Sequence, residues 1–249
     1  MSSNNLASSV ALITGSARRI GAAIAARLHE DGANVAIHYR GSRHEAAALA
    51  DRLNLLRPDS AATFQADLND TKRLPELVAA VVDWSGRLDI LVNNASSFYP
   101  TPPGEITEAQ WDDLIGSNLK APLFLSQAAL TELRAARGVI VNIVDIHAQR
   151  PLANHTVYGP AKAGLAMLTR SLAKDLAPDI RVNGISPGAI LWPEDDMSEA
   201  TKLSILRQVP LGKPGSPEDI AGCVLYLVRD ATYVTGQIIA VDGGRSVGW

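Results

Sequence analysis

The 249-residue chain has one cysteine, Cys223, so it cannot form an internal disulfide, as is typical of proteins from a reducing compartment. It has no basic excess, with 23 Lys and Arg against 26 Asp and Glu, and this argues against a nucleic-acid partner. No apolar run reaches the roughly 18 residues that a membrane span needs. Residues 1–9 lack the charged-then-apolar pattern of a signal peptide. We therefore expect a cytoplasmic protein that binds neither nucleic acid nor membranes.

Hydrophobic residues make up 47% of the chain and charged residues 20%, so the chain can bury a full core and is not disordered. Short apolar runs alternate with segments of helical periodicity, such as Ile20, Ile24 and Leu28. Several runs are apolar on successive residues, as in strands of a parallel sheet covered on both faces. The runs occupy residues 10–13, 35–37, 62–64, 90–92, 139–144, 180–182 and 238–241. The pattern predicts an α/β fold with a doubly wound parallel sheet of about seven strands flanked by helices.

The strand–helix alternation is unbroken, so we expect a single domain over residues 1–249, with a polar N-terminal tail at 1–9. Residues 189–215 are rich in Pro and Gly around a helical stretch near 198–207. This region follows a strand and should lie at the carboxyl edge of the sheet, where open α/β folds bind ligands. We interpret it as a substrate loop.

Residues 14–21 form a glycine-containing turn between the first strand and the first helix. Gly15 allows a sharp bend, and Gly21 allows the helix to approach the sheet closely. The free N–H groups and the positive end of the helix dipole favour a pyrophosphate. In this position the turn predicts a dinucleotide site.

The end of the second strand indicates which dinucleotide binds. A cofactor without a 2′-phosphate is usually held there by Asp or Glu, but this chain has no carboxylate from His38 up to Glu45. Arg40 offers a fork of donors for a phosphate, and Ser42 and His38 can add hydrogen bonds. Two more cations, Arg18 and Arg19, are close in sequence. We therefore predict NADPH/NADP⁺ as the cofactor.

Tyr158 and Lys162 are four residues apart and so share one helix face. A cation near a phenol lowers the phenol's pKa, because it favours the phenolate. Such a tyrosine can donate or accept a proton near neutral pH.

Taken together, these residues resemble the short-chain dehydrogenase/reductase family over nearly the whole chain. The shared motifs are Thr14-Gly15 with Gly21, Asn93-Asn94-Ala95, Asn118, Tyr158 with Lys162, Pro187-Gly188, and the Val-Asp-Gly-Gly of residues 241–244. The resemblance implies a Rossmann-type sheet, Tyr158 as proton donor, Lys162 on the ribose and Asn118 holding a relay water. It also implies a homotetramer, although periodicity alone does not separate this from a dimer.

Two positions depart from the usual family pattern. Arg19 replaces the middle glycine of the turn, and Asp145 replaces the catalytic serine thirteen residues before Tyr158. A carboxylate would repel the alkoxide that develops on a ketone, whereas an acid suits a C=N bond whose nitrogen must gain a proton.

Both departures resemble the pteridine reductase branch, and so does the segment at residues 93–102. In that branch the residue matching Phe98 stacks on the pterin, the one matching Ser96 bonds cofactor phosphate and pterin, and the one matching Arg19 reaches both. The expected catalytic residues are Asp145, Tyr158, Lys162 and Asn118. The expected cofactor residues are Gly15, Arg18, Arg19, Ile20, Gly21, His38, Tyr39, Arg40, Ser42, Asp67, Leu68, Asn94, Ala95, Ser96, Tyr158, Lys162, Pro187 and Gly188. The expected substrate residues are Arg19, Ser96, Phe98, Asp145 and Tyr158.

The resulting hypothesis is an NADPH-dependent reductase of C=N bonds in pterin, dihydropterin or folate-type substrates. Two alternatives stay open: a reductase of another C=N or C=O substrate, and a non-catalytic NADP(H)-binding regulator. The physiological pterin and the contribution of Trp192 in the substrate loop also stay open. His147 and His155 flank the site, but the sequence has no ligand spacing for a metal, and we expect both to be structural.

Overall fold

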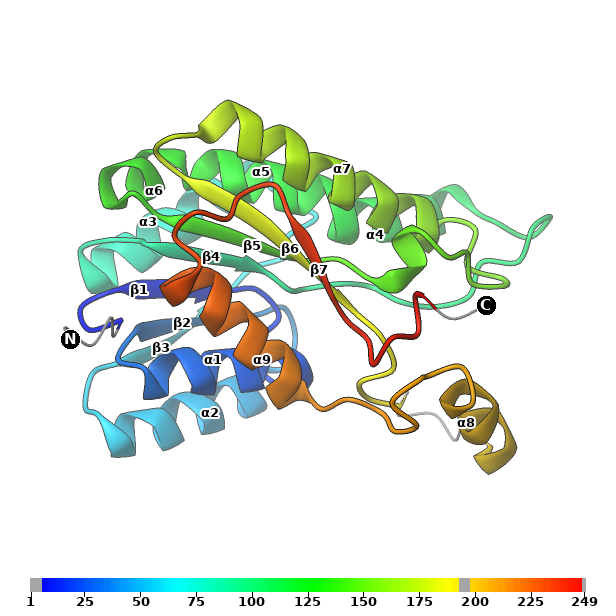
Figure 1. Cartoon of the computed structure of the whole chain (residues 1–249). Helices are drawn as coiled ribbons and strands as arrows, with labels where there is room; N and C mark the ends of the chain where they lie inside the picture. Colours follow the sequence, from blue (N-terminus) through cyan, green and yellow to red (C-terminus); the bar gives the residue numbers. More distant parts are fainter. Residues whose placement is uncertain (1–5, 193–197, 248–249) are drawn as a thin grey trace.

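The computed structural model describes residues 6–192 and 198–247 and contains one seven-stranded parallel sheet in the order β3-β2-β1-β4-β5-β6-β7 (Figure 1). The strands are β1 (Val10–Ile13), β2 (Asn34–Tyr39), β3 (Ala61–Gln65), β4 (Ile90–Asn93), β5 (Val139–Ile143), β6 (Arg181–Pro187) and β7 (Ile238–Val241). The predicted class, a single-domain Rossmann-type sheet flanked by helices, is confirmed.

Helices cover both faces of the sheet, each helix through its apolar side (Figure 1). One layer holds α1 (Arg19–Glu30), α2 (Arg43–Leu56) and α9 (Pro217–Leu225). The other holds α3 (Leu74–Ser85), α4 (Glu108–Ile115), α5 (Ala121–Ala128), α6 (Leu130–Ala136) and α7 (Tyr158–Leu176). In α1 the predicted stripe is the buried side, since Ile24 and Leu28 are fully covered. Burying each such side chain stabilises the fold by about 1.5–3 kcal/mol.

Strand β6 extends well beyond the predicted 180–182, because two polar residues and a glycine in it concealed its length. Asn183, Gly184 and Ser186 interrupt the apolar pattern, yet β6 pairs with β5 on one side and β7 on the other. The buried Asn183 amide is satisfied by the carbonyl of Val234 and the N–H of Gln237. The longer strand carries the chain to Pro187 at the carboxyl edge.

Four short turns complete the described elements: the 3₁₀ turns η1 (Thr71–Arg73) and η3 (Ile146–Ala148) and the π turns η2 (Gly116–Lys120) and η4 (Tyr226–Asp230). Turn η2 lies between α4 and α5 and contains Asn118. Single π turns inside helices frequently mark functional sites.

The predicted loop at 189–215 contains α8 (Glu199–Leu206), which confirms its helical stretch. None of the residues of α8 is buried, and the helix stands apart from both layers (Figure 1). Residues 193–197 lie outside the described part of the chain. The predicted tail at 1–9 is described only from Leu6. From there it is wrong as a tail, because Leu6 is buried and its N–H donates to the carbonyl of Asp31.

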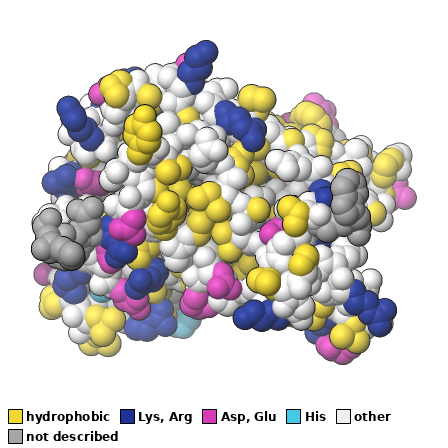
Figure 2. All heavy atoms as spheres, in the orientation of Figure 1, with side chains coloured by type: hydrophobic (Ala, Val, Ile, Leu, Met, Phe, Trp, Pro, Cys, Tyr) yellow, Lys and Arg dark blue, Asp and Glu magenta, His cyan; other side chains and the backbone are white. Residues whose placement is uncertain are grey.

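Apolar side chains also gather on the outside of the molecule, over α9 and the neighbouring β7 (Figure 2). Within the described ranges, no helix is both long and apolar enough to cross a membrane.

Candidate active site

The site begins between β1 and β4, neighbouring strands whose connections lead to opposite ends of the sheet. Thr14 joins the two strand ends: its hydroxyl donates to the carbonyl of Val92 and accepts from the N–H groups of Asn94 and Ala95, at 2.9 and 3.0 Å. The Asn94 amide in turn donates to the carbonyls of Thr14 and Gly15. Open α/β sheets bind their ligands at such a switch point.

The turn after β1 requires its two glycines. Gly15 has φ +60°, and a Cβ there would lie 3.0 Å from the Cα of Ala95. A Cβ on Gly21 would come within 2.5 Å of the Gly15 carbonyl oxygen. Arg19 has φ +56°, a left-handed conformation that costs a non-glycine residue about 1–2 kcal/mol. The backbone therefore keeps the shape of a glycine turn although an arginine occupies the middle position.

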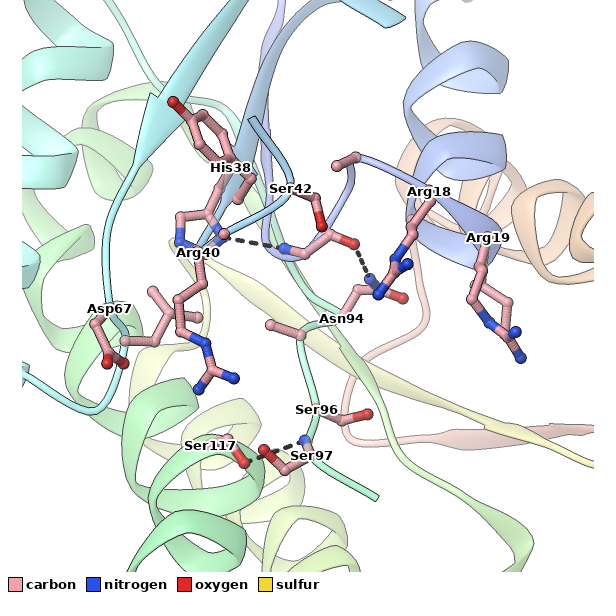
Figure 3. A pocket seen from close by; sticks show the side chains of 18 of the residues that line it. Arg18, Arg19, His38, Arg40, Ser42, Asp67, Asn94, Ser96, Ser97 and Ser117 are labelled. Atoms are coloured by element: carbon pink, nitrogen blue, oxygen red, sulfur yellow. Dashed lines mark hydrogen bonds between the residues drawn. The ribbon is translucent and has the colours of Figure 1, made fainter. Parts of the chain in front are cut away.

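A cavity of about 550 Å³ opens over this turn and over the ends of β2 and β4 (Figure 3). Of the expected cofactor residues it brings together Gly15, Arg18, Arg19, Ile20, Gly21, His38, Tyr39, Arg40, Ser42, Asp67, Leu68, Asn94, Ala95 and Ser96. Tyr158, Lys162, Pro187 and Gly188 do not line it. Sequence reasoning missed Ala17, Gly41, Asn69, Ser97 and Ser117, which do. They lie in loops or at a helix end, where no periodic signal reveals them.

The lining residues fit a phosphorylated dinucleotide. The glycine turn leaves room for a pyrophosphate, and Arg18, Arg19 and Arg40 carry cations on the cavity wall. Asn69 adds a buried side-chain oxygen that has no hydrogen-bond partner within the described residues. Such an acceptor suits an amino group such as that of adenine.

His38 corrects one expectation. Its ring is buried, its Nδ1 accepts from the Gly15 N–H at 3.0 Å, and its Nε2 donates to the carbonyl of Ala66 at 3.2 Å. Burial lowers the pKa of His38 to about 4, so the ring is neutral. The expectation that this ring would bond a phosphate is wrong, because both nitrogens are already engaged. His38 instead holds the turn in place.

The second half of the site lies at the end of β5. The Tyr158 hydroxyl donates to Oδ2 of Asp145 at 2.8 Å, and Oδ1 of Asp145 accepts from the N–H of His147. Lys162 is buried on the next turn of α7, and its Nζ donates to the carbonyl of Ile143. Three of the four expected catalytic residues, Asp145, Tyr158 and Lys162, therefore lie close together at the end of β5.

The pKa of Tyr158 lies well above its ordinary value, because the phenol is buried and faces the Asp145 carboxylate. The expectation of a lowered pKa is therefore wrong. Lys162 Nζ is 5.7 Å from the ring centroid, and burial lowers the pKa of Lys162 to about 8. A raised pKa keeps the phenol protonated at neutral pH, which suits a proton donor.

Phe98 lies beside this pair and is half exposed. Its ring meets the Tyr158 ring edge-on at 4.8 Å between centroids and stacks on His155 at 4.7 Å. Asn118, the fourth expected catalytic residue, positions this segment, since its amide donates to the carbonyl of Ser97 at 2.9 Å. The Ser97 N–H donates to the Ser117 hydroxyl. Turn η2 thus fixes the chain just before Phe98.

Two further segments approach from the far edge. The N–H of Gly188 donates to the carbonyl of Val241, which places Pro187 and Gly188 at the end of β6. Arg245 follows β7. Burial lowers its pKa, and the charges of Asp145 and Asp242 offset part of this lowering. Sequence reasoning missed Arg245, which follows Asp145 by one hundred positions. Arg19 also reaches this side, donating to the carbonyl of Trp192 at the start of the substrate loop.

Both flanking histidines have protein partners: Nδ1 of His147 bonds the carbonyl of Arg150, and Nδ1 of His155 bonds that of Ala153. In the part of the chain that the structure describes, no three His, Cys, Asp or Glu side chains are grouped to hold a metal ion.

Comparison with known proteins agrees with this geometry. The family model described as "Enoyl-(Acyl carrier protein) reductase" matches residues 15–246. The chain is 40% identical to pteridine reductase 1 of Leishmania tarentolae over 279 aligned positions, covering 96% of each chain. It is 38% identical to the 3-oxoacyl-[acyl-carrier-protein] reductase FabG of Staphylococcus aureus, covering 94% of this chain and 96% of that one. An uncharacterized oxidoreductase of Methylorubrum extorquens is 34% identical over 97% of this chain. Because the match runs from the glycine turn past β7, the chain belongs to the short-chain dehydrogenase/reductase family, whose members are oxidoreductases that use NAD(P)H.

Proposed function

We propose that this protein is an NADPH-dependent pteridine reductase, which reduces a C=N bond of a pterin, dihydropterin or folate-type substrate. The observation that carries the proposal is the hydrogen bond of 2.8 Å from the Tyr158 hydroxyl to Asp145. A carboxyl group occupies the position where the family's ketone reductases have a serine hydroxyl. The resemblance to a pteridine reductase over 96% of the chain supports the same assignment.

The residues around Tyr158 can manage the proton that C=N reduction requires. Bound NADPH would supply a hydride to the carbon of the reduced bond. Tyr158, protonated at neutral pH, donates toward the nitrogen, and Asp145 orients the phenol and accepts from N–H or amino donors of the substrate. Pterins carry such donors and simple ketones do not. The cationic Lys162 and Arg245 limit the cost of a negative charge on Asp145.

Phe98 supplies a stacking surface for a flat heterocycle. Phe98 is 49% exposed although its ring stacks on His155 and lies against Tyr158, so part of the side chain remains accessible. Offset stacking of aromatic rings adds about 0.5–1.5 kcal/mol beyond area burial. Ser96, on the cavity wall two residues earlier, is the residue that we propose contacts both cofactor and substrate.

The preference for NADPH rests on the cavity end near β2. Arg40 lines the cavity there, and the sequence has no acidic side chain from 38 to 42 that would bind a free ribose 2′-hydroxyl. The proposal includes a cytoplasmic location, which the single cysteine favours, and a homotetramer, which the family resemblance implies.

The second candidate is reduction of a ketone, which is favoured by the 38% identity to a 3-oxoacyl-[acyl-carrier-protein] reductase. The two candidates differ at Asp145, because a carboxylate repels a developing alkoxide and does not repel a ring nitrogen that gains a proton.

The deciding experiment follows NADPH oxidation with 7,8-dihydrobiopterin, with 7,8-dihydrofolate and with acetoacetyl-coenzyme A. We expect turnover of the first two and a kcat/KM at least about tenfold lower for the ketone. Tyr158→Phe should lose about 10²–10⁴-fold in rate while NADPH binding persists. Turnover of acetoacetyl-coenzyme A alone would establish the ketone reductase. NADPH binding without turnover of any substrate would favour a regulator.

A further inference from the structure

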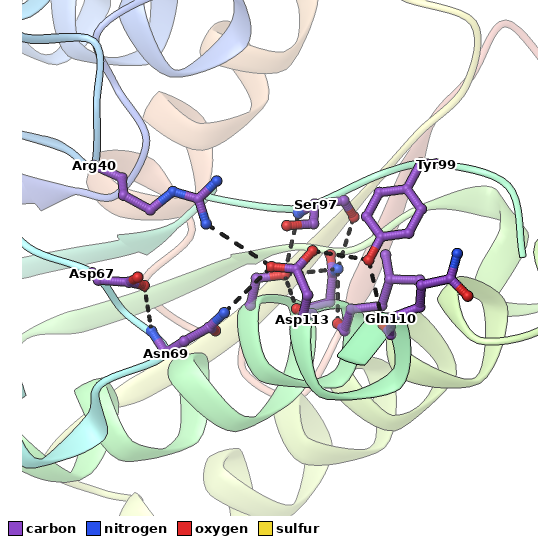
Figure 4. Close-up of polar contacts among 10 residues, drawn as sticks. Arg40, Asp67, Asn69, Ser97, Tyr99, Gln110 and Asp113 are labelled. Atoms are coloured by element: carbon purple, nitrogen blue, oxygen red, sulfur yellow. Dashed lines mark hydrogen bonds and ion pairs between the residues drawn. The ribbon is translucent and has the colours of Figure 1, made fainter. Parts of the chain in front are cut away.

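Asp113 on α4 lies between the two halves of the site and contacts both (Figure 4). Its Oδ1 is 3.9 Å from Nη1 of Arg40 and accepts from the amide of Asn69 at 3.4 Å. Its Oδ2 accepts from the hydroxyl of Tyr99 at 3.1 Å. The Asp113 carboxylate therefore faces Arg40, the proposed phosphate-binding cation, and also holds Tyr99, the residue that follows Phe98.

The contact with Arg40 concerns the proposed 2′-phosphate. A phosphate dianion that approaches Arg40 also approaches the Asp113 carboxylate. The carboxylate neutralises part of the guanidinium charge and repels the incoming phosphate. The Arg40 side chain is 62% exposed and that of Asp113 30%, so solvent weakens both effects without removing them.

The contact with Tyr99 concerns the substrate. Burial and the Asp113 carboxylate raise the pKa of Tyr99, so its hydroxyl remains a donor at neutral pH. Ser117 and Asn118 already hold Ser97 on the other side of Phe98. Asp113 and turn η2 thus fix the segment that carries Phe98 from both sides.

We propose that Asp113 determines specificity in two ways: it moderates the preference for a 2′-phosphorylated cofactor through Arg40, and it positions Phe98 through Tyr99. The inference rests on the proposed function, and it assigns a role to a residue outside the cofactor turn and the catalytic residues.

The charge effect is tested with Asp113→Asn, which removes the charge and keeps an acceptor for Tyr99. The probes are NADPH, NADH and adenosine 2′,5′-bisphosphate, titrated calorimetrically. We expect NADPH and adenosine 2′,5′-bisphosphate to bind about three- to tenfold more tightly than to the wild type, and NADH binding to change by less than about twofold. The matched control is Asp112→Asn, which removes one charge from the exposed neighbouring position. Unchanged or weaker binding of both 2′-phosphorylated probes to Asp113→Asn would overturn this part.

The positioning effect is tested with Tyr99→Phe and Asp113→Ala, which both remove the hydrogen bond. Amide hydrogen exchange reads the segment without any substrate. We expect the Ser97 and Phe98 amides to exchange at least about fivefold faster in both variants and at the wild-type rate in Asp113→Asn. The KM for 7,8-dihydrobiopterin should rise in the same two variants. Wild-type exchange in Tyr99→Phe and Asp113→Ala would overturn this part.

These outcomes separate the inference from the proposed function. If the wild-type protein bound NADPH and NADH equally, the proposed cofactor preference would fail. Adenosine 2′,5′-bisphosphate would still test the charge effect, because Asp113 faces Arg40 whichever cofactor is natural. Likewise, absence of pterin turnover would refute the proposed substrate and leave the exchange measurement decisive.

Discussion

The N–H of Gly15 donates to Nδ1 of His38 over 3.0 Å, so a side chain of β2 supports the turn that follows β1. The other ring nitrogen donates to the carbonyl of Ala66, just after β3. One neutral imidazole thus joins three neighbouring strand ends beneath the proposed cofactor.

This arrangement predicts acid sensitivity. The pKa of His38 is about 4 in the folded state against an ordinary value of 6.5, so below pH 6.5 the unfolded chain binds a proton that the folded chain does not. Stability is then complete above pH 6.5 and is lost as the pH falls toward 4, by about 2 kcal/mol at pH 5. His38→Leu should be less stable at pH 7, where it loses two hydrogen bonds, and should lose less stability between pH 7 and pH 5. Urea unfolding at both pH values measures this, with exposed His44→Leu as control. An unchanged pH dependence in His38→Leu would assign the acid sensitivity to other groups.

Lys162 predicts a second rise of stability with pH, in the alkaline range. Its pKa is lowered to about 8 by burial, against an ordinary 10.5, so between these values the unfolded chain holds a proton that the folded chain has released. The protein should therefore gain stability as the pH rises from 8 to 10.5. At pH 7 the buried charge costs about 3 kcal/mol, and the hydrogen bond to Ile143 returns about 1 kcal/mol.

Lys162→Met should thus be about 2 kcal/mol more stable at pH 7 while losing most activity. Chemical unfolding at pH 7 and pH 10 checks the first part, and NADPH oxidation checks the second. A variant less stable than the wild type at pH 7 would contradict the cost assigned to the buried charge.

Arg40 predicts the cofactor preference. Arg40→Ala should weaken NADPH binding at least about tenfold, because a charge-assisted contact to phosphate contributes about 1.5–3 kcal/mol. NADH binding should change by less than about twofold, since NADH has no 2′-phosphate. Titration of both cofactors measures this, with the exposed Arg52→Ala as the matched loss of charge. Equal weakening of both cofactors would place Arg40 elsewhere on the dinucleotide.

Asp145 predicts the choice of substrate. Asp145→Ser restores the family's usual hydroxyl, so kcat/KM for 7,8-dihydrobiopterin should fall at least about tenfold, which is roughly 1.4 kcal/mol of transition-state stabilisation. Reduction of acetoacetyl-coenzyme A should hold steady or rise. Asp145→Asn keeps an acceptor for the His147 N–H and separates loss of the acid from loss of the local fold. Undiminished pterin reduction in folded Asp145→Ser would remove Asp145 from the chemistry.

The sequence alone was sufficient to locate the strands along the chain and to anticipate one central contact of the site. Short apolar runs indicated the seven strands of the described sheet, most directly where successive apolar residues are buried on both faces, as in β1. Asp145 and Tyr158 are thirteen residues apart, and the short η3 turn between β5 and α7 brings them to 2.8 Å. Local spacing could anticipate this, because little chain separates the two residues.

Properties that depend on burial could not be predicted in this way. The spacing of Tyr158 and Lys162 indicated a lowered phenol pKa, whereas desolvation and the facing Asp145 raise it. His38 at a strand end was expected to be open to a ligand, but pairing of β2 with both β1 and β3 encloses its ring. Asp113 and Arg245 belong to no local pattern, since their neighbours come from distant segments of the chain.

The pairing of β1 with β4 has a consequence for biosynthesis. The N–H of Val10 bonds the carboxylate of Asp89, 79 positions later, and the Asn94 amide closes the turn around Gly15. On a ribosome, β1, α1 and β2 emerge early, yet the turn stays open until β4 and Asn94 have followed. Because contacts so distant in sequence form late, the nascent chain gains its nucleotide-binding shape only after more than a third of it has been made. From that stage onward, a dinucleotide in the cell can stabilise the growing fold by mass action.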